Sequence, residues 1–270
     1  MDRKNGKLNK IYLGTNTKMF KNTEETVWFV RELEHYVADV DRERLNLFVI
    51  PSFMSIGPAA AVGKMTIIGA QNMGWEKRGA FTGEISPLML KEAGASLVMA
   101  GHSERRHIFG ETDLQENKKV LCALKHGFTA LLCVGETRED KEYGISDEVL
   151  RIQIKTGLKG VDAGQAKRLW IAYEPVWAIG EDGEPASREY AEEKHRVIRL
   201  ALTELFGKAA GEQIPILYGG SVNQKNAPGM IRTEGIDGLF IGRSAWDVEN
   251  FSRIIHECFD VYTEIRGKDS

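Results

Sequence analysis

Eight short apolar segments recur along the chain, and most of them are followed by a turn residue and a stretch of helical periodicity. Each segment is nearly continuously apolar, which is typical of strands buried on both faces of a parallel sheet. Residues 24–37, 115–126 and 188–206 lie between such segments and repeat apolar side chains at helical spacing. The eight segments are residues 11–13, 47–50, 65–70, 97–100, 130–134, 169–173, 216–218 and 239–241.

This number of strand-then-helix units fits one closed architecture. Eight units in about 250 residues match a (β/α)₈ barrel, which normally forms a single domain. The alternative is a doubly wound open sheet, but Gly14-Thr15-Asn16 stands where its GxGxxG fingerprint is expected. We therefore predict a single-domain α/β protein, a (β/α)₈ barrel over residues 1–270, with a frayed tail at 266–270.

Composition excludes several other classes of protein. The 36 Lys and Arg against 39 Asp and Glu leave a net charge of −3, which gives no reason to expect nucleic acid or an anionic membrane as a partner. No apolar stretch approaches the roughly 18 residues of a membrane span, and residues 1–10 lack the apolar core of a signal peptide. The three cysteines are widely spaced and show no metal-ligand spacing. We expect a cytoplasmic protein without metal or cofactor.

Polar residues and glycines stand at the ends of several predicted strands. In a (β/α)₈ barrel the carboxyl ends of the strands and the loops that follow them form one functional rim. Each residue alone has a structural interpretation: a solvated lysine, a helix-capping histidine, a strand end in solvent, or an ordinary turn. Together they place an acid, an imidazole and a cation on one rim. The set comprises Asn16, Lys18, His102, Glu104, Glu174, Gly180, Gly219, Gly220, Ser221 and Gly242.

The residue types on this rim suit one class of reaction. Glu174 offers a carboxylate base, and Lys18 offers a positive charge for a developing enediolate. His102 precedes a predicted short helix, whose positive end would keep the imidazole neutral and able to exchange a proton with a carbonyl oxygen. The glycine-bearing loops can present backbone N–H groups to a phosphate. The set predicts proton abstraction next to the carbonyl of a small phosphorylated sugar.

Several motifs, in order over about 240 residues, resemble the triosephosphate isomerase family. That family is itself the standard example of a carboxylate base paired with a neutral histidine, so the resemblance carries this pairing. The matching motifs are Asn16-x-Lys18-Met19, Gly69-Ala70-Gln71-Asn72, Gly79-Ala80-Phe81-Thr82-Gly83-Glu84, Gly101-His102-Ser103-Glu104-Arg105-Arg106, Cys133-Val134-Gly135-Glu136-Thr137, Tyr173-Glu174-Pro175-Val176-Trp177-Ala178-Ile179-Gly180 and Tyr218-Gly219-Gly220-Ser221-Val222.

The resemblance implies a role for each matching residue. Glu174 would move the proton between carbons, His102 would serve the oxygens, and Lys18 would bind and polarise the substrate with help from Asn16. Glu104 would pair with Lys18 or orient the site. Residues 175–180 would begin a lid that excludes water from the enediolate. Gly180, Ser221 and Gly242 would supply N–H groups to the phosphate.

The resemblance also implies a partner chain. Residues 71–84 are similar to the loop with which members of the family interdigitate with a twin subunit. A homodimer is therefore implied, with Thr82 near the active site of the partner.

The chain departs from the family pattern at several places around the site. Thr17 stands where tryptophan is usual, and Phe20 where asparagine is usual. The lid segment 180–187 has an acidic tip, with Glu181 and Asp182, and a proline in its second hinge. Arg243 replaces a glycine of the phosphate loop, and Phe240 a leucine.

These departures resemble the L-erythrulose-1-phosphate isomerase branch of the family, which acts in erythritol catabolism and carries the segment found here at residues 238–246. L-Erythrulose 1-phosphate keeps the phosphate–CH₂–carbonyl spacing of dihydroxyacetone phosphate and adds one CH₂OH beyond the reacting carbons. The product would be D-erythrulose 4-phosphate. Phe240 is then expected near the extra hydroxymethyl group, while Arg243 either reaches the phosphate or turns outward to an acidic neighbour.

Three alternatives stay open. The departures can be neutral drift in an ordinary triosephosphate isomerase, which interconverts dihydroxyacetone phosphate and D-glyceraldehyde 3-phosphate in glycolysis. A non-catalytic phosphosugar-binding relative would keep the fold without turnover, against which the presence of Lys18, His102 and Glu174 argues. An aldolase on a similar barrel would need a Schiff-base lysine inside a strand or a metal, whereas Lys18 lies past the end of its segment.

Overall fold

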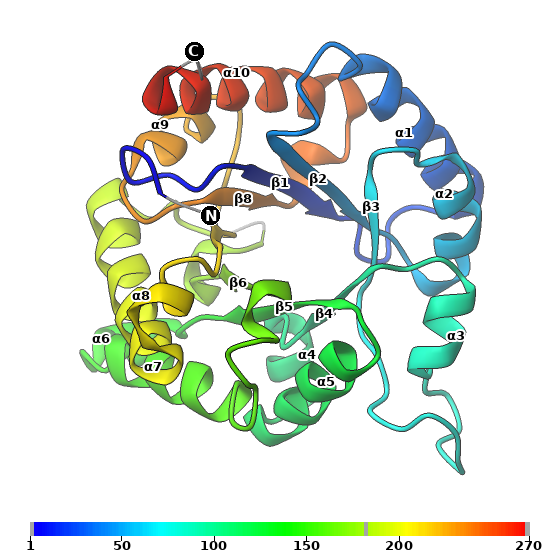
Figure 1. Cartoon of the computed structure of the whole chain (residues 1–270), viewed down its shortest axis with the longest axis horizontal. Coiled ribbons are helices and arrows are strands. Elements are labelled where there is room, and N and C mark those ends of the chain that lie inside the picture. Colours follow the sequence, from blue (N-terminus) through cyan, green and yellow to red (C-terminus); the bar gives the residue numbers. More distant parts are fainter. Residues whose placement is uncertain (1–2, 181–182, 268–270) are drawn as a thin grey trace.

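The eight predicted strands form a closed parallel barrel in the computed structural model, which describes residues 3–180 and 183–267. Each strand pairs with its sequence neighbours, and β8 pairs with β1 (Figure 1). The barrel prediction is therefore confirmed. The strands are β1 Ile11–Asn16, β2 Leu45–Ile50, β3 Ile67–Ala70, β4 Leu97–Ala100, β5 Thr129–Val134, β6 Leu169–Tyr173, β7 Ile216–Tyr218 and β8 Gly238–Ile241.

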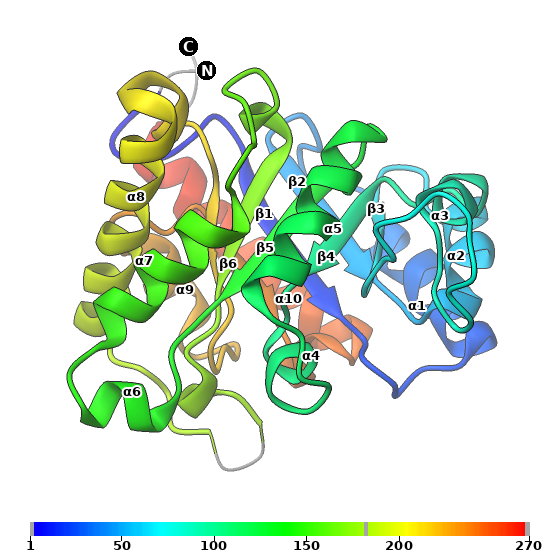
Figure 2. The same ribbon diagram turned by 90° about the horizontal axis from the view of Figure 1, so that it is seen from below.

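Helices cover the outside of the barrel, and they include the three stretches of helical periodicity (Figures 1 and 2). Helix α5 begins two residues before the predicted start because Thr112 and Gln115 form a capping box. The helices are α1 Thr23–Tyr36, α2 Ile56–Val62, α3 Pro87–Glu92, α4 Ser103–His107, α5 Asp113–Lys125, α6 Arg138–Glu142, α7 Ser146–Gly157, α8 Arg188–Gly211, α9 Ala227–Arg232 and α10 Val248–Arg266.

The predicted frayed tail was wrong at its first residue. Arg266 is the last residue of α10, and its guanidinium donates a hydrogen bond to the carbonyl of Lys7 at 3.1 Å. This bond ties the end of the chain's last helix to the segment before β1. Residues 268–270 of that expectation lie outside the described residues.

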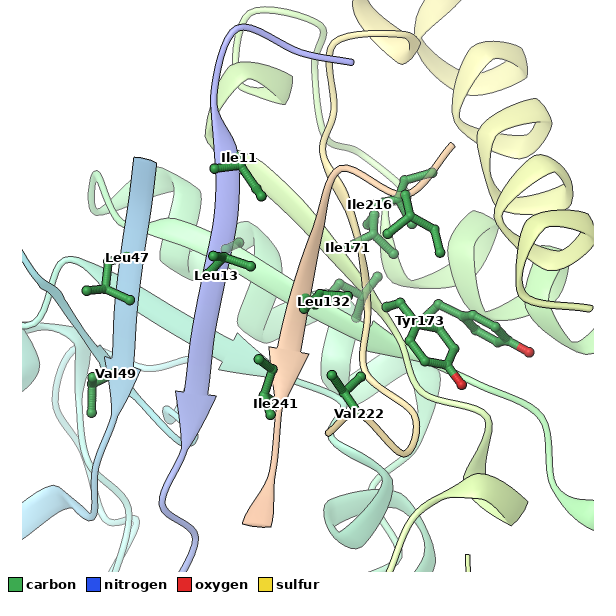
Figure 3. Close-up of a cluster of buried hydrophobic side chains, with 14 of the residues drawn as sticks. Ile11, Leu13, Leu47, Val49, Leu132, Ile171, Tyr173, Ile216, Val222 and Ile241 are labelled. Carbon is green, nitrogen blue, oxygen red and sulfur yellow. The ribbon is translucent and has the colours of Figure 1, made fainter. Parts of the chain in front are cut away.

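Two apolar layers hold the barrel together. Side chains such as Leu13, Leu47 and Ile171 point outward from the strands toward the helices (Figure 3). Alternate residues fill the inside, where Phe48 packs against Phe240 with 5.7 Å between ring centroids. Burying one such side chain contributes about 1.5–3 kcal/mol, so both faces of every strand stabilise the fold. This explains why the strand segments are apolar throughout.

Barrel closure depends on a glycine in β8. Gly238 pairs with Tyr12 of β1, and a Cβ at Gly238 would lie 1.9 Å from the Tyr12 carbonyl oxygen. No side chain fits there unless the β1–β8 ladder separates. That ladder brings the loop after β8 beside the loop after β1, so this close approach also determines the geometry at the mouth of the barrel.

We expect Gly238→Ala to destabilise the protein by about 3 kcal/mol or more, because it forces backbone apart in a packed core. Urea denaturation followed by circular dichroism measures this change. The matched control is Gly57→Ala in α2, where the nearest contact of a new Cβ outside its own helix is the Ala93 carbonyl oxygen at 3.9 Å. Equal stability of the two variants would contradict the account of closure.

A buried group of charges supports α4, the short helix after β4. Arg105 of α4 forms an ion pair with Glu111, and Lys119 Nζ lies 2.5 Å from the other carboxylate oxygen of Glu111. Glu116 is fully buried, 3.7 Å from Lys119 Nζ. Burial raises the pKa of Glu116 to about 7, and the neighbouring Glu111 adds to the rise. Burial also acts to raise the pKa of Glu111, but hydrogen bonds from Arg105, Glu116 and Lys119 outweigh it and lower that pKa to about 2.

Glu116 makes stability fall as the pH rises toward 7. Its pKa is higher in the folded state than the ordinary 4.5, so folding favours the protonated form, and this stabilisation is lost between about pH 4.5 and 7. The side chain introduced by Glu116→Gln does not titrate, so only the wild type loses this stabilisation. The free energy of unfolding of the variant, measured relative to that of the wild type, should therefore rise by about 2 kcal/mol from pH 5 to pH 8. Denaturant titrations at the two pH values test this, with exposed Glu24→Gln as control. A difference between variant and wild type that does not change with pH would contradict it.

Candidate active site

The carboxyl ends of five strands surround one pocket of about 290 Å³. Helix α4 and the loop after β6 lie at the same end of the barrel (Figure 2). Every residue that sequence analysis placed at a strand end for catalysis or substrate binding lines this pocket. These residues are Asn16, Lys18, His102, Glu174, Gly180, Ser221, Gly242 and Arg243.

Two supporting residues from the sequence analysis lie outside the pocket lining. Glu104 follows His102 in α4, and its carboxylate forms an ion pair with Lys18 Nζ at 2.7 Å. Thr82 lies in the exposed loop between β3 and α3 and does not line this pocket in the single chain. Its expected place near the active site of a partner chain stays a prediction.

Lys18 sits in a strained turn just beyond β1. Its φ is +50°, in the left-handed region that non-glycine residues rarely adopt. The backbone N–H of Lys18 donates to Asn16 Oδ1 at 2.8 Å, and Gln71 Nε2 donates to the Lys18 carbonyl at 2.7 Å. Gln71 also donates to Asn16 Oδ1 at 3.0 Å. The sequence alone did not single out Gln71 as a site residue. The signal was present, because Gln71 is a polar residue directly after a strand, like the site residues that were predicted.

His102 is the N-cap of α4, so the predicted short helix begins at Ser103. Its Nδ1 accepts a hydrogen bond from the backbone N–H of Glu104 at 3.2 Å. An accepting nitrogen carries no proton, so in this arrangement the ring is neutral and holds its proton on Nε2. Nε2 lies 3.6 Å from Glu174 Oε1. The capping and chemical interpretations of His102 are thus compatible, because the cap orients the ring.

Glu174 is buried at the end of β6, with 3% of its surface exposed. Its Oε2 accepts a hydrogen bond from the backbone N–H of Ser103 at 3.3 Å. Glycines leave room for it: a Cβ at Gly135 would lie 1.8 Å from the Glu174 carbonyl oxygen, and one at Gly219 would lie 2.9 Å from its Cγ. Cys133 is fully buried beside it, and burial raises the pKa of this thiol, as expected of a core cysteine.

Gly180 and Gly242 of the pocket differ in their backbone conformation and in the space around them. Gly180 has a φ of +96°, which favours glycine. A Cβ at Gly242 would meet nothing within 4 Å, so packing within the chain does not explain that glycine, and it leaves backbone open to the pocket. Ser221 and Arg243 line the same pocket. This part of the pocket has the room and the exposed backbone to receive an anionic group.

Glu136 connects both ends of the loop that follows β6. This buried carboxylate accepts hydrogen bonds from Trp177 Nε1 and the Tyr190 hydroxyl, each at 2.8 Å. Trp177 lies before residues 181–182 and Tyr190 lies in α8 after them, so one carboxylate binds both flanks of this loop. The acidic tip predicted from the sequence, Glu181 and Asp182, lies outside the described residues.

Phe240 forms part of the pocket floor. It is buried in β8, where its ring packs against Phe48 inside the barrel, and it also lines the pocket. Arg243 is exposed at the rim, at the start of the 3₁₀ turn η4 (Arg243–Ala245). Substitutions at Phe240 therefore change the depth of the pocket, whereas substitutions at Arg243 change the charge at its entrance.

The described residues contain no helix that is both long and apolar enough to span a membrane. Within the same part of the chain, His, Cys, Asp and Glu side chains nowhere gather in threes in a way that suits a metal ion.

A family model described as triosephosphate isomerase matches residues 11–258. With the closed barrel and its pocket, this match defines the protein as a sugar-phosphate isomerase. The chain belongs to the triosephosphate isomerase family. The resemblance found in the sequence motifs is thereby confirmed.

Relatives with two different names are similar to the chain. The L-erythrulose-1-phosphate isomerase of Rhizobium etli is 48% identical over 250 residues, which cover 91% of this chain and 91% of that protein. The triosephosphate isomerase of Carboxydothermus hydrogenoformans is 44% identical over 250 residues, covering 92% of this chain and 98% of that protein. The L-erythrulose-1-phosphate isomerase of Rhizobium meliloti is 43% identical over 248 residues, which cover 91% of this chain and 95% of that protein.

Proposed function

We propose that this enzyme interconverts L-erythrulose 1-phosphate and D-erythrulose 4-phosphate through a cis-enediol(ate). The observation that carries the proposal is the convergence of Glu174, His102 and Lys18 in one pocket, with His102 Nε2 3.6 Å from Glu174 Oε1. A base, a neutral proton donor and a cation at this spacing suit proton transfer between adjacent carbons. The identity to erythrulose-phosphate isomerases supports the choice of substrate.

The proton transfers balance within the substrate and two side chains. Glu174 takes the proton from C3 of L-erythrulose 1-phosphate while His102 Nε2–H gives its proton to the oxygen on C2. The enediol then loses its C3 hydroxyl proton to the imidazole, and Glu174 returns a proton to C2. The carbonyl has moved from C2 to C3, and both side chains have regained their starting states. Lys18 stabilises the negative charge that develops on the oxygens.

The glycine-bearing side of the pocket would hold the phosphate. Gly180, Ser221 and Gly242 would supply backbone N–H groups, and Arg243 at the rim adds a positive charge. Closure of the loop after β6, with its hinges anchored on Glu136, would exclude water from the enediolate, which otherwise readily eliminates phosphate. Phe240 on the floor would contact the extra hydroxymethyl group of the four-carbon substrate.

The test is a comparison of kcat/KM for L-erythrulose 1-phosphate and dihydroxyacetone phosphate with the same enzyme. We expect a preference of about a hundredfold or more for the tetrulose, about 2.7 kcal/mol in transition-state binding. Phe240→Leu should reduce this preference. The reverse preference would make the protein a triosephosphate isomerase acting in glycolysis, an alternative that the 44% identity to such an enzyme supports.

Glu174→Asp should lower kcat by about a hundredfold, because it withdraws the carboxylate by about 1 Å from the carbon that it deprotonates. Glu24→Asp, on the exposed face of α1, is the matched control and should keep wild-type turnover. Initial rates at saturating substrate measure both variants. Unchanged turnover in Glu174→Asp would exclude this residue as the base, and a wild-type enzyme without turnover on either sugar would favour a phosphosugar-binding relative.

We further propose that the enzyme is a cytoplasmic homodimer that acts in erythritol breakdown. The loop at residues 71–84 projects from the barrel between β3 and α3 (Figure 1), and it exposes 48% of Phe81. Neighbouring Met89 is 56% exposed, so the loop and α3 present apolar surface that a second copy would cover. Three free cysteines support a reducing compartment. Sedimentation equilibrium should give twice the chain mass, and a monomer at micromolar concentration would contradict the dimer.

A further inference from the structure

Trp246 joins the loop after β8 to the loop after β1. It directly follows the turn η4, and it lines the pocket. Its indole Nε1 donates a hydrogen bond to the carbonyl oxygen of Asn16 at 2.9 Å. Its ring also packs against Phe20, with 4.4 Å between centroids and 35° between the ring planes. One side chain therefore contacts the residues on both sides of Lys18.

The hydrogen bond from Trp246 to Asn16 replaces a backbone hydrogen bond that β8 no longer provides at this position. The register between β1 and β8 ends at the pair Thr15↔Ile241. On its other flank β1 keeps its backbone contacts further, because the N–H of Thr17 donates to the Ile50 carbonyl at 3.1 Å. The carbonyl of Asn16 thus lies past the last β1–β8 pair, and the Trp246 side chain supplies its donor. Asn16 is buried, so removal of this donor would leave a buried acceptor unpaired.

Lys18 depends on support of this kind because its backbone is strained. A residue held at a φ of +50° persists only where its surroundings fix it. Asn16 Oδ1 and the Gln71 side chain fix Lys18 from the β2 and β3 side. The bond from Trp246 fixes Asn16 itself from the β8 side. Asn16 is therefore held between the two flanks, and its side chain in turn holds the N–H of Lys18.

The contact between Phe20 and Trp246 does not belong to the hydrophobic core. Phe20 is 68% exposed and the adjacent Met19 is 95% exposed, so this segment buries little apolar surface within the chain. The aromatic contact instead links the segment after β1 to the loop after β8 at the mouth of the pocket. Lys18 lies in that segment, and its Nζ projects to Glu104 beside the pocket.

We propose that Trp246 is a positioning residue that holds the Lys18 ammonium in place through Asn16 and Phe20. This inference rests on the proposed function, in which Lys18 is the cation of an isomerase site. Trp246 lines the same pocket as Lys18, so a change at this residue acts directly beside the ammonium's surroundings.

Trp246→Phe tests the proposal because it removes the N–H donor while keeping a smaller aromatic ring that can contact Phe20. It should lower kcat/KM about tenfold on the preferred phosphosugar, of the order expected for one lost hydrogen bond to a buried acceptor, with most of the loss in kcat. Trp246→Leu also loses the ring contact and should lose more activity. Trp28→Phe on α1, where the side chain is 54% exposed, is the matched control and should behave as wild type.

Binding gives a second readout that needs no turnover. Calorimetric titration with sn-glycerol 3-phosphate, a phosphate ester without a carbonyl, should show weaker binding to both Trp246 variants than to Trp28→Phe. Trp246 variants that match Trp28→Phe in kcat/KM and in this affinity would overturn the proposal, whatever their thermal stability. If the wild-type enzyme turns over neither phosphosugar, the proposed function fails, and the affinity for glycerol 3-phosphate alone decides whether Trp246 positions the site.

Discussion

The pairing of β8 with β1 brings distant parts of the sequence to one point. Tyr12 pairs with Gly238 and Thr15 with Ile241, which closes the sheet. Once it is closed, the parallel strands all end on the same rim, and the loops after β1 and β8 become neighbours although more than 220 residues separate Asn16 from Trp246. The pocket lies on this rim, so its geometry depends on the backbone approach that Gly238 allows.

Hydrogen bonds from backbone groups orient the imidazole and the carboxylate of the candidate site. The first turn of α4 donates to His102 Nδ1 and also to Glu174 Oε2, so one helix start positions both the imidazole and the carboxylate. The ammonium of Lys18 is paired with Glu104 from the same helix. His102 and Glu174 are buried, where the effective dielectric is low. The hydrogen bonds from the backbone N–H groups to these two side chains are therefore electrostatically stronger than they would be in water. The ion pairs of Arg105 and Lys119 keep α4 itself in place.

Much of this arrangement could be predicted from the sequence. Continuous apolar segments identify buried parallel strands, and the rule that function lies at strand ends places Lys18, His102 and Glu174 together without coordinates. The ends of elements were harder to predict: β3 begins at Ile67 rather than at residue 65, and Arg266 is part of α10. Periodicity does not reveal such ends, because capping and side-chain contacts determine them.

Long-range contacts were the features that the sequence did not reveal. In the sequence, Phe20 and the segment ending at Trp246 are separate departures from the family pattern. Only the closed barrel shows that the rings of Phe20 and Trp246 are in contact. Gln71 likewise supports Lys18 from a different strand. Glu116 is a carboxylate in helix α5, yet it is fully buried. Each depends on which elements pack together, and a single sequence does not encode that directly.

We propose that Glu174 moves a proton from one carbon to the next through an enediol(ate). The decisive experiment is isomerisation of L-erythrulose 1-phosphate in D₂O, followed by proton NMR of the product. We expect deuterium from solvent on the carbon that gains hydrogen, because the carboxylate can exchange its proton before returning it. Complete retention of the substrate hydrogen in the product would indicate hydride transfer between the carbons and would exclude proton transfer by Glu174.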